Sequence, residues 1–373
     1  MIIGVPKEIK ADEYRVAVLP VGAQLLTQDA HTVLIERGAG LGSGFDDKKY
    51  SAAGARIAET ADEIYTQAEM IVKVKEPQPT EIARFHEGQI IFCYFHFAAS
   101  RELTAACLEA GIVAVAYETL RDAHGRLPLL TPMSEIAGKM SIQEGAKYLE
   151  RPMMGRGILL GGVAGVEPAN VLILGGGVVG TNAARVAAGM GANVTIMDID
   201  LDRLRYLDEV MPANVTTIYC DPHAVKQYAV NADLIIGAVL IPGDRTPVLI
   251  KRSLLKKMKP GSVIVDVSVD QGGCIETCRP TTHHDPAYAV DGVLHYCVTN
   301  MPGAVGRTSS QALCNATLPF VRKLASLGAD AFAALDPSHA AAINIKDYRI
   351  VNDIISEVFP DLSKQLTPSS PNE

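Results

Sequence analysis

Residues 171–198 read VLIL-GGGVVG-TNAARVAAGMGA-NVTIMD, and this stretch decides the fold. An apolar run of strand length precedes Gly175, an alanine-rich segment that can form a helix follows Gly180, and a second β-like run ends at Asp198. Strand, G-x-G-x-x-G turn, helix, strand and an acid about 20 residues further on are the parts of a dinucleotide-binding βαβ unit, in the required order. The alternative is an ordinary glycine-rich turn of a parallel sheet, which the complete set of parts disfavours.

Each glycine of the motif has its own physical task. Gly175 permits a tight turn, Gly177 lets the backbone approach a pyrophosphate, and Gly180 lets the helix and the strand pack closely. The N-terminus of the following helix adds unpaired N–H groups and the positive end of the helix dipole, which both favour phosphate.

Asp198 indicates which dinucleotide is bound. Its carboxylate, at the tip of the second strand, can accept hydrogen bonds from a ribose diol but would repel a 2′-phosphate. NAD is therefore favoured over NADP. Arg203 and Arg205, close behind, temper this preference without reversing it.

Length predicts two domains, and the cysteine pattern described below favours the cytoplasm. The chain has 373 residues, of which 48% are hydrophobic, and a net charge of −8. No block of Lys and Arg is present, so a nucleic-acid partner is not expected. The first residues lack the features of a signal peptide, and polar residues interrupt the apolar stretch 155–180, so no membrane segment is expected either.

The cysteines form no recognisable framework. All seven are scattered, at 93, 107, 220, 274, 278, 297 and 314. Cys274 and Cys278 are close, but no second pair completes a zinc site, so reduced thiols are expected. For the adjacent His283 and His284, on a polar loop, a solvated role is favoured over metal binding. No metal is predicted.

Strand and helix signals alternate along the chain, which predicts parallel sheets covered on both faces. Strands are expected at 2–5, 32–35, 70–74, 90–95, 113–116, 234–238, 263–269 and 296–298, and helices at 52–67 and 101–110. Ser134 is expected to cap a helix that runs to about residue 149.

The C-terminal part predicts helices, at 309–327 and 346–358, without a sheet of their own. Packing back onto the first domain is the simplest arrangement for them. We therefore predict an α/β fold of two Rossmann-like, doubly wound parallel-sheet domains. An NAD-binding domain, 129–306, is inserted into a discontinuous substrate and catalytic domain, 1–128 and 307–373, and the active site is expected in the cleft between them.

Hydride transfer to a nicotinamide requires a cation for the substrate and a group that exchanges protons near neutral pH, at the carboxyl ends of strands. His96 follows the apolar run 90–95 and has a suitable ordinary pKa. The alternative for it is a hydrogen-bonded core histidine. Lys75 follows the run 70–74, where Lys73 and Lys75 are expected on one face, and the alternative is a solvated edge strand.

Two further residues meet the same requirement. Arg15 opens an expected strand, 16–19, and its planar guanidinium suits a carboxylate, although a surface ion pair is equally compatible. Asp270 ends the expected strand 263–269, where it would face the active site. Asp266 competes with it but is expected to lie deeper in the sheet.

Long ordered strings carry more specific information than these single residues. They are Gly4-Val5-Pro6-Lys7-Glu8, Glu13-x-Arg15-Val16-Ala17, Val74-Lys75-Glu76-Pro77, Tyr94-Phe95-His96-Phe97-Ala98, Thr131-Pro132-Met133-Ser134-Glu135-x-Ala137-Gly138, Val265-Asp266-Val267-Ser268-Val269-Asp270-Gln271-Gly272-Gly273 and Asn300-Met301-Pro302-Gly303-Ala304-Val305. With them the chain resembles, nearly end to end, the L-alanine dehydrogenase family.

The resemblance implies an NAD-dependent amino-acid dehydrogenase that converts L-alanine reversibly to pyruvate and ammonium. Arg15 and Lys75 match the residues that hold the substrate carboxylate and carbonyl. His96 matches the proton-transfer residue, and Asp270 the acid that helps to place and activate water.

The resemblance also implies a set of cofactor-lining residues and an oligomer, usually a homohexamer. Besides the three glycines and Asp198, the cofactor-lining set comprises Ser134, Val178, Val179, Arg203, Cys220, Val239, Leu240, Val267, Ser268, Val269, Asp270, Val298, Thr299, Asn300 and Met301.

The sequence departs from the family pattern in several places. Gly306 stands where a proline is usual, and Cys220 replaces a frequent serine near the adenosine. Glu118 matches an acid that is a metal ligand in some members, but Leu327 stands where its partner histidine would be.

Other functions are compatible with the glycine motif. One is the nucleotide-binding subunit of a proton-translocating transhydrogenase, which would not need the set Arg15, Lys75, His96 and Asp270 and would accompany membrane helices. Another is a dehydrogenase of a different small amino or imino acid. A third is a non-catalytic NAD-binding regulatory protein, in which the acid and base would not be preserved.

Overall fold

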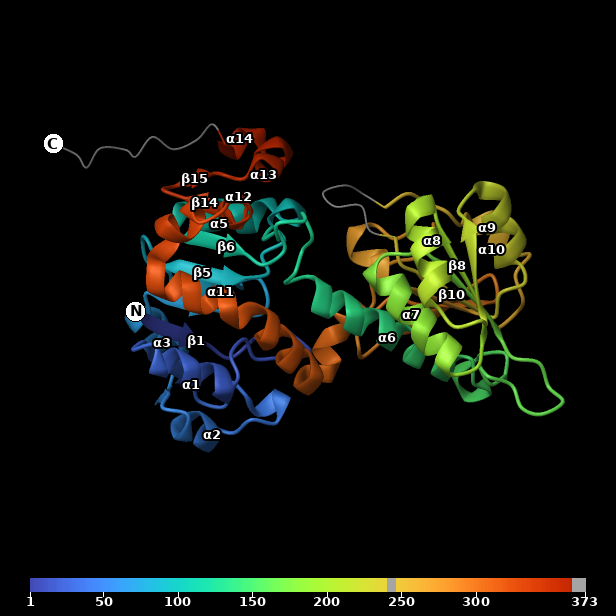
Figure 1. Cartoon of the computed structure of the whole chain (residues 1–373), viewed down its shortest axis with the longest axis horizontal. Helices are drawn as coiled ribbons and strands as arrows, with labels where there is room; N and C mark the ends of the chain where they lie inside the picture. The colour runs from blue at the N-terminus through green and yellow to red at the C-terminus, as the bar shows by residue number, and fades with distance from the viewer. Residues whose placement is uncertain (240–245, 364–373) are drawn as a thin grey trace. The chain divides into compact units, whose positions relative to one another are not determined.

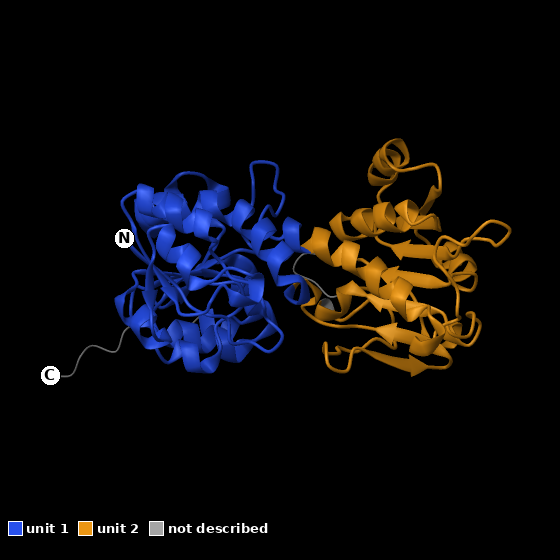
Figure 2. Ribbon diagram, turned by 90° about the horizontal axis from the view of Figure 1, so that it is seen from below, with its two compact units in different colours: residues 1–133, 303–373 blue, residues 134–302 orange. Residues whose placement is uncertain are grey.

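The computed structural model describes residues 1–239 and 246–363 (Figure 1). They form two compact units: unit 1 is Met1–Met133 with the chain from Gly303 onward, and unit 2 is Ser134–Pro302 (Figure 2). These boundaries lie a few residues from the 128/129 and 306/307 expected from the sequence. Each unit has a sheet of mainly parallel strands with helices beside it, so the predicted α/β class with two Rossmann-like sheets is confirmed.

Unit 1 contains an eight-stranded sheet in the order β15-β14-β6-β5-β4-β1-β2-β3. The strands from β6 to β3 are parallel, and β14 is antiparallel to both β6 and β15. The strands are β1 (Ile2–Val5), β2 (Thr32–Glu36), β3 (Arg56–Ala58), β4 (Met70–Val72), β5 (Ile90–Cys93), β6 (Val113–Ala116), β14 (Ile343–Lys346) and β15 (Arg349–Ile350).

Helices and short 3-10 turns complete unit 1, and one of them, η5, begins in the last residues of unit 2. They are α1 (Pro20–Gln28), η1 (Leu41–Ser43), α2 (Asp47–Ala52), α3 (Ala61–Gln67), α4 (Pro79–Ile82), η2 (Phe97–Ala99), α5 (Arg101–Glu109), η5 (Met301–Val305), α11 (Gly306–Ala334), α12 (Pro337–Ala340), α13 (Asp353–Val358) and α14 (Pro360–Ser363). Side-chain caps fix helix starts: Thr60 accepts from the N–H of Glu63, and Ser100 from that of Leu103. Central strands such as β5 and β6 are buried along their whole length, as expected of a covered parallel sheet.

Three expectations for unit 1 are wrong. The expected helix 52–67 is interrupted, because Gly54 takes φ +89° after α2 and the edge strand β3 follows. The expected strand 16–19 is a loop in which the N–H of Val16 donates to Ser310 Oγ at 2.8 Å. The expected helix 346–358 begins as a hairpin, in which β14 and β15 extend the sheet before α13.

Unit 2 contains a seven-stranded sheet in the order β12-β13-β11-β10-β7-β8-β9. All neighbours are parallel except β12 and β13. Its strands are β7 (Asn170–Leu174), β8 (Asn193–Asp198), β9 (Val215–Tyr219), β10 (Leu234–Gly237), β11 (Val263–Asp266), β12 (Ala287–Val290) and β13 (Val293–Tyr296). Apart from the edge pair β12 and β13, chain order runs outward from β7 in both directions. A topological switch point therefore lies between β7 and β10, the usual place for a ligand in such sheets.

The helices of unit 2 are α6 (Thr131–Tyr148), which begins in the last residues of unit 1, η3 (Arg151–Met153), α7 (Val178–Gly189), α8 (Leu201–Val210), α9 (Pro222–Ala229), α10 (Arg252–Leu255) and η4 (Val267–Gln271). Among the described residues, no helix is both long enough and apolar enough to cross a membrane.

Three expectations for unit 2 need correction. Ser134 is not a cap, because α6 starts at Thr131 and already includes it. The strand expected at 263–269 ends at Asp266 and continues as the turn η4. The strand expected at 296–298 is β13, three residues earlier.

The close approach of helix and strand at Gly180 yields a stability prediction. A Cβ on Gly180 would lie 1.9 Å from the carbonyl oxygen of Gly175, whereas a Cβ on Gly189, in the same helix α7, would meet nothing within 4 Å. We expect Gly180→Ala to lower the free energy of unfolding by about 2 to 3 kcal/mol through overpacking. Urea denaturation measures it.

Gly189→Ala is the matched control, since it adds the same methyl group to the same helix in open space. It should leave the stability unchanged or raise it by up to about 1 kcal/mol through helix propensity. Equal destabilisation by both variants would contradict the packing role of Gly180.

Candidate active site

The glycine turn after β7 leaves the start of α7 open. Gly177 is the N-cap of α7 without a side-chain cap, and a Cβ placed there would meet nothing within 4 Å. Gly175 has φ +104°, and a Cβ there would lie 2.6 Å from the carbonyl oxygen of Ala238 on the neighbouring β10 end. The first N–H groups of α7, in Val178 and Val179, therefore have room for a phosphate group, and the turn fits a dinucleotide.

Asp198 and Arg203 hold this turn from the β8 side. Asp198 Oδ2 accepts from the N–H of Gly176 at 2.7 Å, and Oδ1 from that of Asp200 at 2.9 Å. Arg203 donates to the carbonyl of Gly176 and to Thr181 Oγ1, both at 2.6 Å. The guanidinium thus braces the turn itself, a contact that the sequence did not reveal.

Cys220 lies beside Asp198, because its N–H donates to the Asp198 carbonyl at 2.9 Å. Its thiol is half-buried, and burial raises the pKa of Cys220, helped by the nearby carboxylates of Asp198 and Asp221. The thiol is therefore protonated at neutral pH.

The switch point between β7 and β10 gathers a second group of the predicted cofactor residues. Val239 follows β10, and its carbonyl accepts from Ser268 Oγ at 2.7 Å. Val267, Val269 and Asp270 lie with Ser268 on η4, and the carboxylate of Asp270 is exposed. Leu240 lies outside the described residues.

Asp266 fixes η4 at both ends. It is 1% exposed and accepts from the N–H groups of Ser268 and Cys274, both at 3.0 Å. Burial raises the pKa of Asp266, although these hydrogen bonds oppose the rise. Asp266 is buried, as expected, and it is the last residue of β11. The turn η4, which Asp266 caps, leaves Asp270 exposed.

The remaining predicted cofactor residues lie on one short segment and on α6. Val298 bridges Thr281, and the N–H of Thr299 donates to the Thr281 carbonyl at 3.2 Å. Asn300 has the left-handed φ of +58°, and Met301 starts η5. Ser134 lies in the first turns of α6.

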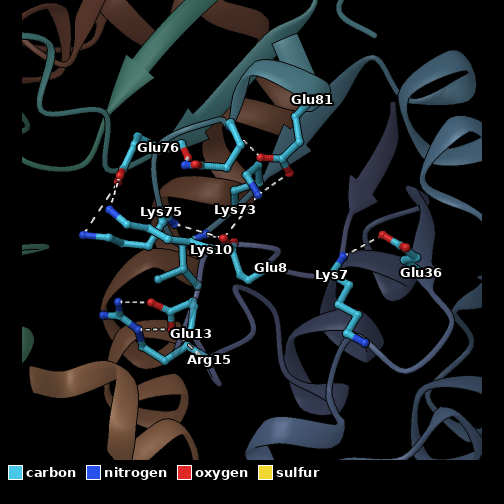
Figure 3. A network of polar contacts seen from close by, with 12 residues as sticks. Lys7, Glu8, Lys10, Glu13, Arg15, Glu36, Lys73, Lys75, Glu76 and Glu81 are labelled. Carbon is cyan, nitrogen blue, oxygen red and sulfur yellow. Dashed lines mark hydrogen bonds and ion pairs between the residues drawn. The ribbon is translucent and has the colours of Figure 1, made fainter. Parts of the chain in front are cut away.

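In unit 1, Arg15 is buried and held by Glu13 (Figure 3). Arg15 Nε donates to Glu13 Oε1 at 2.6 Å, Nη2 to Oε2, and the Arg15 N–H to Oε1 at 3.0 Å. Nη1 lies 3.1 Å from Met133 Sδ. The ion pair is therefore a buried bidentate one, which fixes the plane of the guanidinium, and not the surface pair considered from the sequence.

Lys73 and Lys75 have different environments, contrary to the sequence prediction. Strand β4 ends at Val72, and the Lys73 side chain is 1% exposed, with Nζ 2.6 Å from Glu81 Oε1 and 3.2 Å from Glu8 Oε2. Burial alone would lower the pKa of Lys73, but Glu8 and Glu81 raise it, so the ammonium stays charged.

Lys75 is the less buried of the two lysines. Its Nζ lies 3.7 Å from Glu76 Oε2, and its N–H donates to Glu8 Oε2 at 3.4 Å. Glu8 also accepts from the N–H of Val74 at 2.6 Å. The carboxylate of Glu8, in the chain that follows β1, therefore fixes the backbone that follows β4 (Figure 3).

His96 follows β5, is exposed and has the left-handed φ of +53°. The ring of Tyr94 lies parallel to the imidazole, with 5.9 Å between centroids. His96 is thus not a core histidine. Because β5, β4 and β1 are neighbours in one parallel sheet, their carboxyl ends bring His96, Lys75 and the Glu8 cluster to the same edge.

No group of three or more His, Cys, Asp or Glu residues suited to a metal ion is found among the residues that the structure describes. All seven cysteines are free thiols.

Two family models match consecutive parts of the chain. Residues 4–137 match "Alanine dehydrogenase/PNT, N-terminal domain", and residues 141–353 match "Alanine dehydrogenase/PNT, C-terminal domain". The chain is 51% identical over 359 residues to the alanine dehydrogenase of Halomonas elongata, covering 96% of this chain and 97% of that protein.

The chain belongs to the alanine dehydrogenase/PNT family.

Solved structures agree with this family assignment, and the resemblance drawn from the sequence is confirmed. An L-alanine dehydrogenase structure matches with a TM-score of 0.94 and 50% identity, over 97% of this chain and 100% of that chain. A transhydrogenase from Sinorhizobium meliloti matches with a TM-score of 0.82 and 26% identity, over 94% of this chain and 100% of that chain. Both branches of the alanine dehydrogenase/PNT family therefore share this fold, and the alanine dehydrogenase has the higher sequence identity.

The buried ion pairs of Lys73 with Glu8 and Glu81 yield a prediction that depends on pH. We expect Lys73→Met to lower the free energy of unfolding by about 3 to 5 kcal/mol near neutral pH, because two buried carboxylates lose their cation. Burial raises the pKa of Glu8 above 4.5, and Lys73 opposes that rise, so the pKa of Glu8 is higher still in the variant.

A carboxyl group whose pKa is higher in the folded than in the unfolded chain stabilises the fold more as the pH falls through the folded pKa. The deficit of Lys73→Met should therefore shrink as the pH is lowered from neutrality toward the ordinary pKa of a glutamate, as urea denaturation at several pH values will measure. Lys7→Met, which removes an exposed ammonium, is the control and should change stability by less than about 0.5 kcal/mol. A deficit independent of pH would contradict the pairing.

Proposed function

We propose that this chain is an NAD-dependent L-alanine dehydrogenase, which converts L-alanine, water and NAD reversibly to pyruvate, ammonium, NADH and a proton. The observation that carries the proposal is the arrangement of Lys75 and His96 at one sheet edge, with Arg15 preset by Glu13, in a chain half identical to proteins named alanine dehydrogenase. A dinucleotide-binding βαβ unit follows in the same chain.

Arg15 and Lys75 hold the substrate in this proposal. The bidentate contact with Glu13 uses Nε and one N–H of Nη2. It fixes the plane of the guanidinium, and with it the direction of Nη1 and of the second N–H of Nη2, where the substrate carboxylate would bind. Lys75, whose backbone is tied to Glu8, places an ammonium beside the oxygen that develops into the carbonyl of pyruvate.

His96 and Asp270 move the protons. NAD, when bound, would supply the hydride acceptor, and loss of a hydride from Cα of alanine in its neutral-amine form would leave an iminium. Water then adds to the iminium carbon with His96 as the base, and ammonia leaves as the carbinolamine collapses. Asp270 helps to place and activate that water. Exposure of both side chains suits exchange of protons with solvent.

The proposed NAD site consists of the glycine turn, Asp198, Arg203 and η4. Ser134, Cys220, Val239 and the segment 298–301 complete it. In this proposal Asp198 discriminates against NADP, and the position of its carboxylate at the tip of β8, beside the turn, supports that role. We further propose that the protein is cytoplasmic and that it forms a homo-oligomer with six subunits, as the family resemblance implies.

The direct test of the proposed reaction is to mix the purified protein with L-alanine and NAD and to follow the absorbance of NADH. We expect turnover with L-alanine and NAD, and much less when NADP replaces NAD at the same concentration. Turnover with glycine or serine but none with alanine would exclude the substrate and keep the enzyme class. No turnover with any small amino acid would favour a transhydrogenase subunit or a non-catalytic NAD-binding protein.

The role of His96 has its own test. His96→Ala removes the proposed base from an exposed position, so kcat for alanine should fall by about 10² to 10⁴-fold while the fold is retained. The Kd for NAD, measured by calorimetry, and the Kd for NADH, measured by its fluorescence, should both change little, because the proposed NAD site lies in unit 2. Wild-type kcat in this variant would remove His96 from the mechanism. His86→Ala, at another exposed histidine of unit 1, is the control.

A further inference from the structure

The backbone conformation of His96 is unusual for a residue with a Cβ. Its φ is +53° and its ψ is +42°, in the left-handed region that is unfavourable for residues other than glycine. The conformation turns the imidazole out of the sheet, since His96 is exposed whereas Phe95 and Phe97, on either side, are 1% exposed. Such a conformation persists only where the surroundings hold it.

The carboxylate of Glu118 provides that hold. Glu118 Oε1 accepts from the N–H of His96 at 2.6 Å and from the N–H of Phe95 at 3.2 Å, and Oε2 lies 3.3 Å from the N–H of Phe95. Both N–H groups have left the strand ladder, which for β5 ends where the N–H of Tyr94 donates to the Val74 carbonyl at 3.1 Å. One carboxylate thus satisfies two successive backbone donors through charge-assisted hydrogen bonds.

The sheet fixes the place of Glu118. It comes two residues after β6, the parallel neighbour of β5, and the N–H of Tyr117 still donates to the Cys93 carbonyl at 2.9 Å. On the other side of His96, its own carbonyl accepts from the N–H of Ala99 at 2.9 Å. The Tyr94 ring lies beside the imidazole at an interplanar angle of 5°.

We propose that Glu118 is a positioning residue for His96. Its oxygens hold the backbone of Phe95 and His96 in the turn that presents the imidazole for proton transfer. The proposal rests on the role given to His96 above. This role requires only that the side chain at position 118 has an oxygen that accepts hydrogen bonds; it requires neither a negative charge nor a transferable proton. It therefore differs from metal ligation, the role that the family resemblance attaches to this acid in some members.

Two substitutions separate the acceptor from the charge. Glu118→Ala removes both, and we expect kcat for alanine to fall by about 10- to 100-fold while KM for NAD changes less than about twofold, as for a displaced catalytic group. Glu118→Gln keeps an oxygen that can accept from both N–H groups, so its kcat should stay within about threefold of the wild type. Glu109→Ala, at an exposed carboxylate on α5, is the control and should match the wild type.

A second measurement does not depend on the role of His96. Hydrogen exchange, read by mass spectrometry on peptides that end on either side of residue 96, should show a faster amide at His96 in Glu118→Ala and a near-normal one in Glu118→Gln. If His96→Ala proved fully active, this readout would still test the contact. Should Glu118→Ala fail to fold, Glu118→Met keeps the side-chain volume without an acceptor, and the same results are expected from it.

Three results would overturn the proposal. Equal loss of kcat in Glu118→Gln and Glu118→Ala would assign the effect to the charge. Wild-type kcat in Glu118→Ala would show that His96 needs no such hold. An unchanged exchange rate at the His96 amide in Glu118→Ala would show that the hydrogen bond does not fix the backbone.

Discussion

The arrangement of the chain after β1 and β4 in unit 1 depends on the buried ion cluster of Lys73 with Glu8 and Glu81. Desolvation makes each of these charges costly, so the cluster exists only because every member has a partner at close range. Tyr65 donates to Glu81 at 2.9 Å, and Glu8 accepts from two backbone N–H groups after β4. The cluster therefore links the chain after β1 to the chain after β4. Because the N–H of Lys75 donates to Glu8, the cluster also fixes the position of the Lys75 backbone.

The same device recurs at other strand ends. A parallel strand that stops leaves backbone N–H groups without ladder partners, and such donors must be satisfied when buried. Glu8 serves this purpose after β4, Glu118 after β5, Asp198 after β7, and Asp266 after β11. Each carboxylate lies on or after one strand and accepts from a turn near it. In all four places the turn so held carries, or leads into, a residue proposed to bind or react.

Much of the fold could be predicted because its signals are local. The βαβ unit of residues 171–198 combines apolar runs, glycines and an acid within one short segment, and the structure places β7, α7 and β8 there. β14 and β15 were missed, since the turn between them uses Asp347 and Tyr348 at φ +50° and +59°. No glycine or asparagine signals this hairpin, and the partner of β14 in the sheet, β6, is distant in sequence.

Residue type identified the candidate side chains but not their supports. Acids such as Glu8, Glu13 and Glu118 could equally face a ligand, a metal or the backbone, and only the geometry distinguishes these uses. The proposed reacting groups His96 and Asp270 are exposed, whereas Asp266, below η4, is 1% exposed. Replacing an exposed group removes chemistry at little structural cost, whereas replacing a buried clamp alters both the turn and the stability. The demands of folding and of reaction are thus assigned to different side chains a few residues apart.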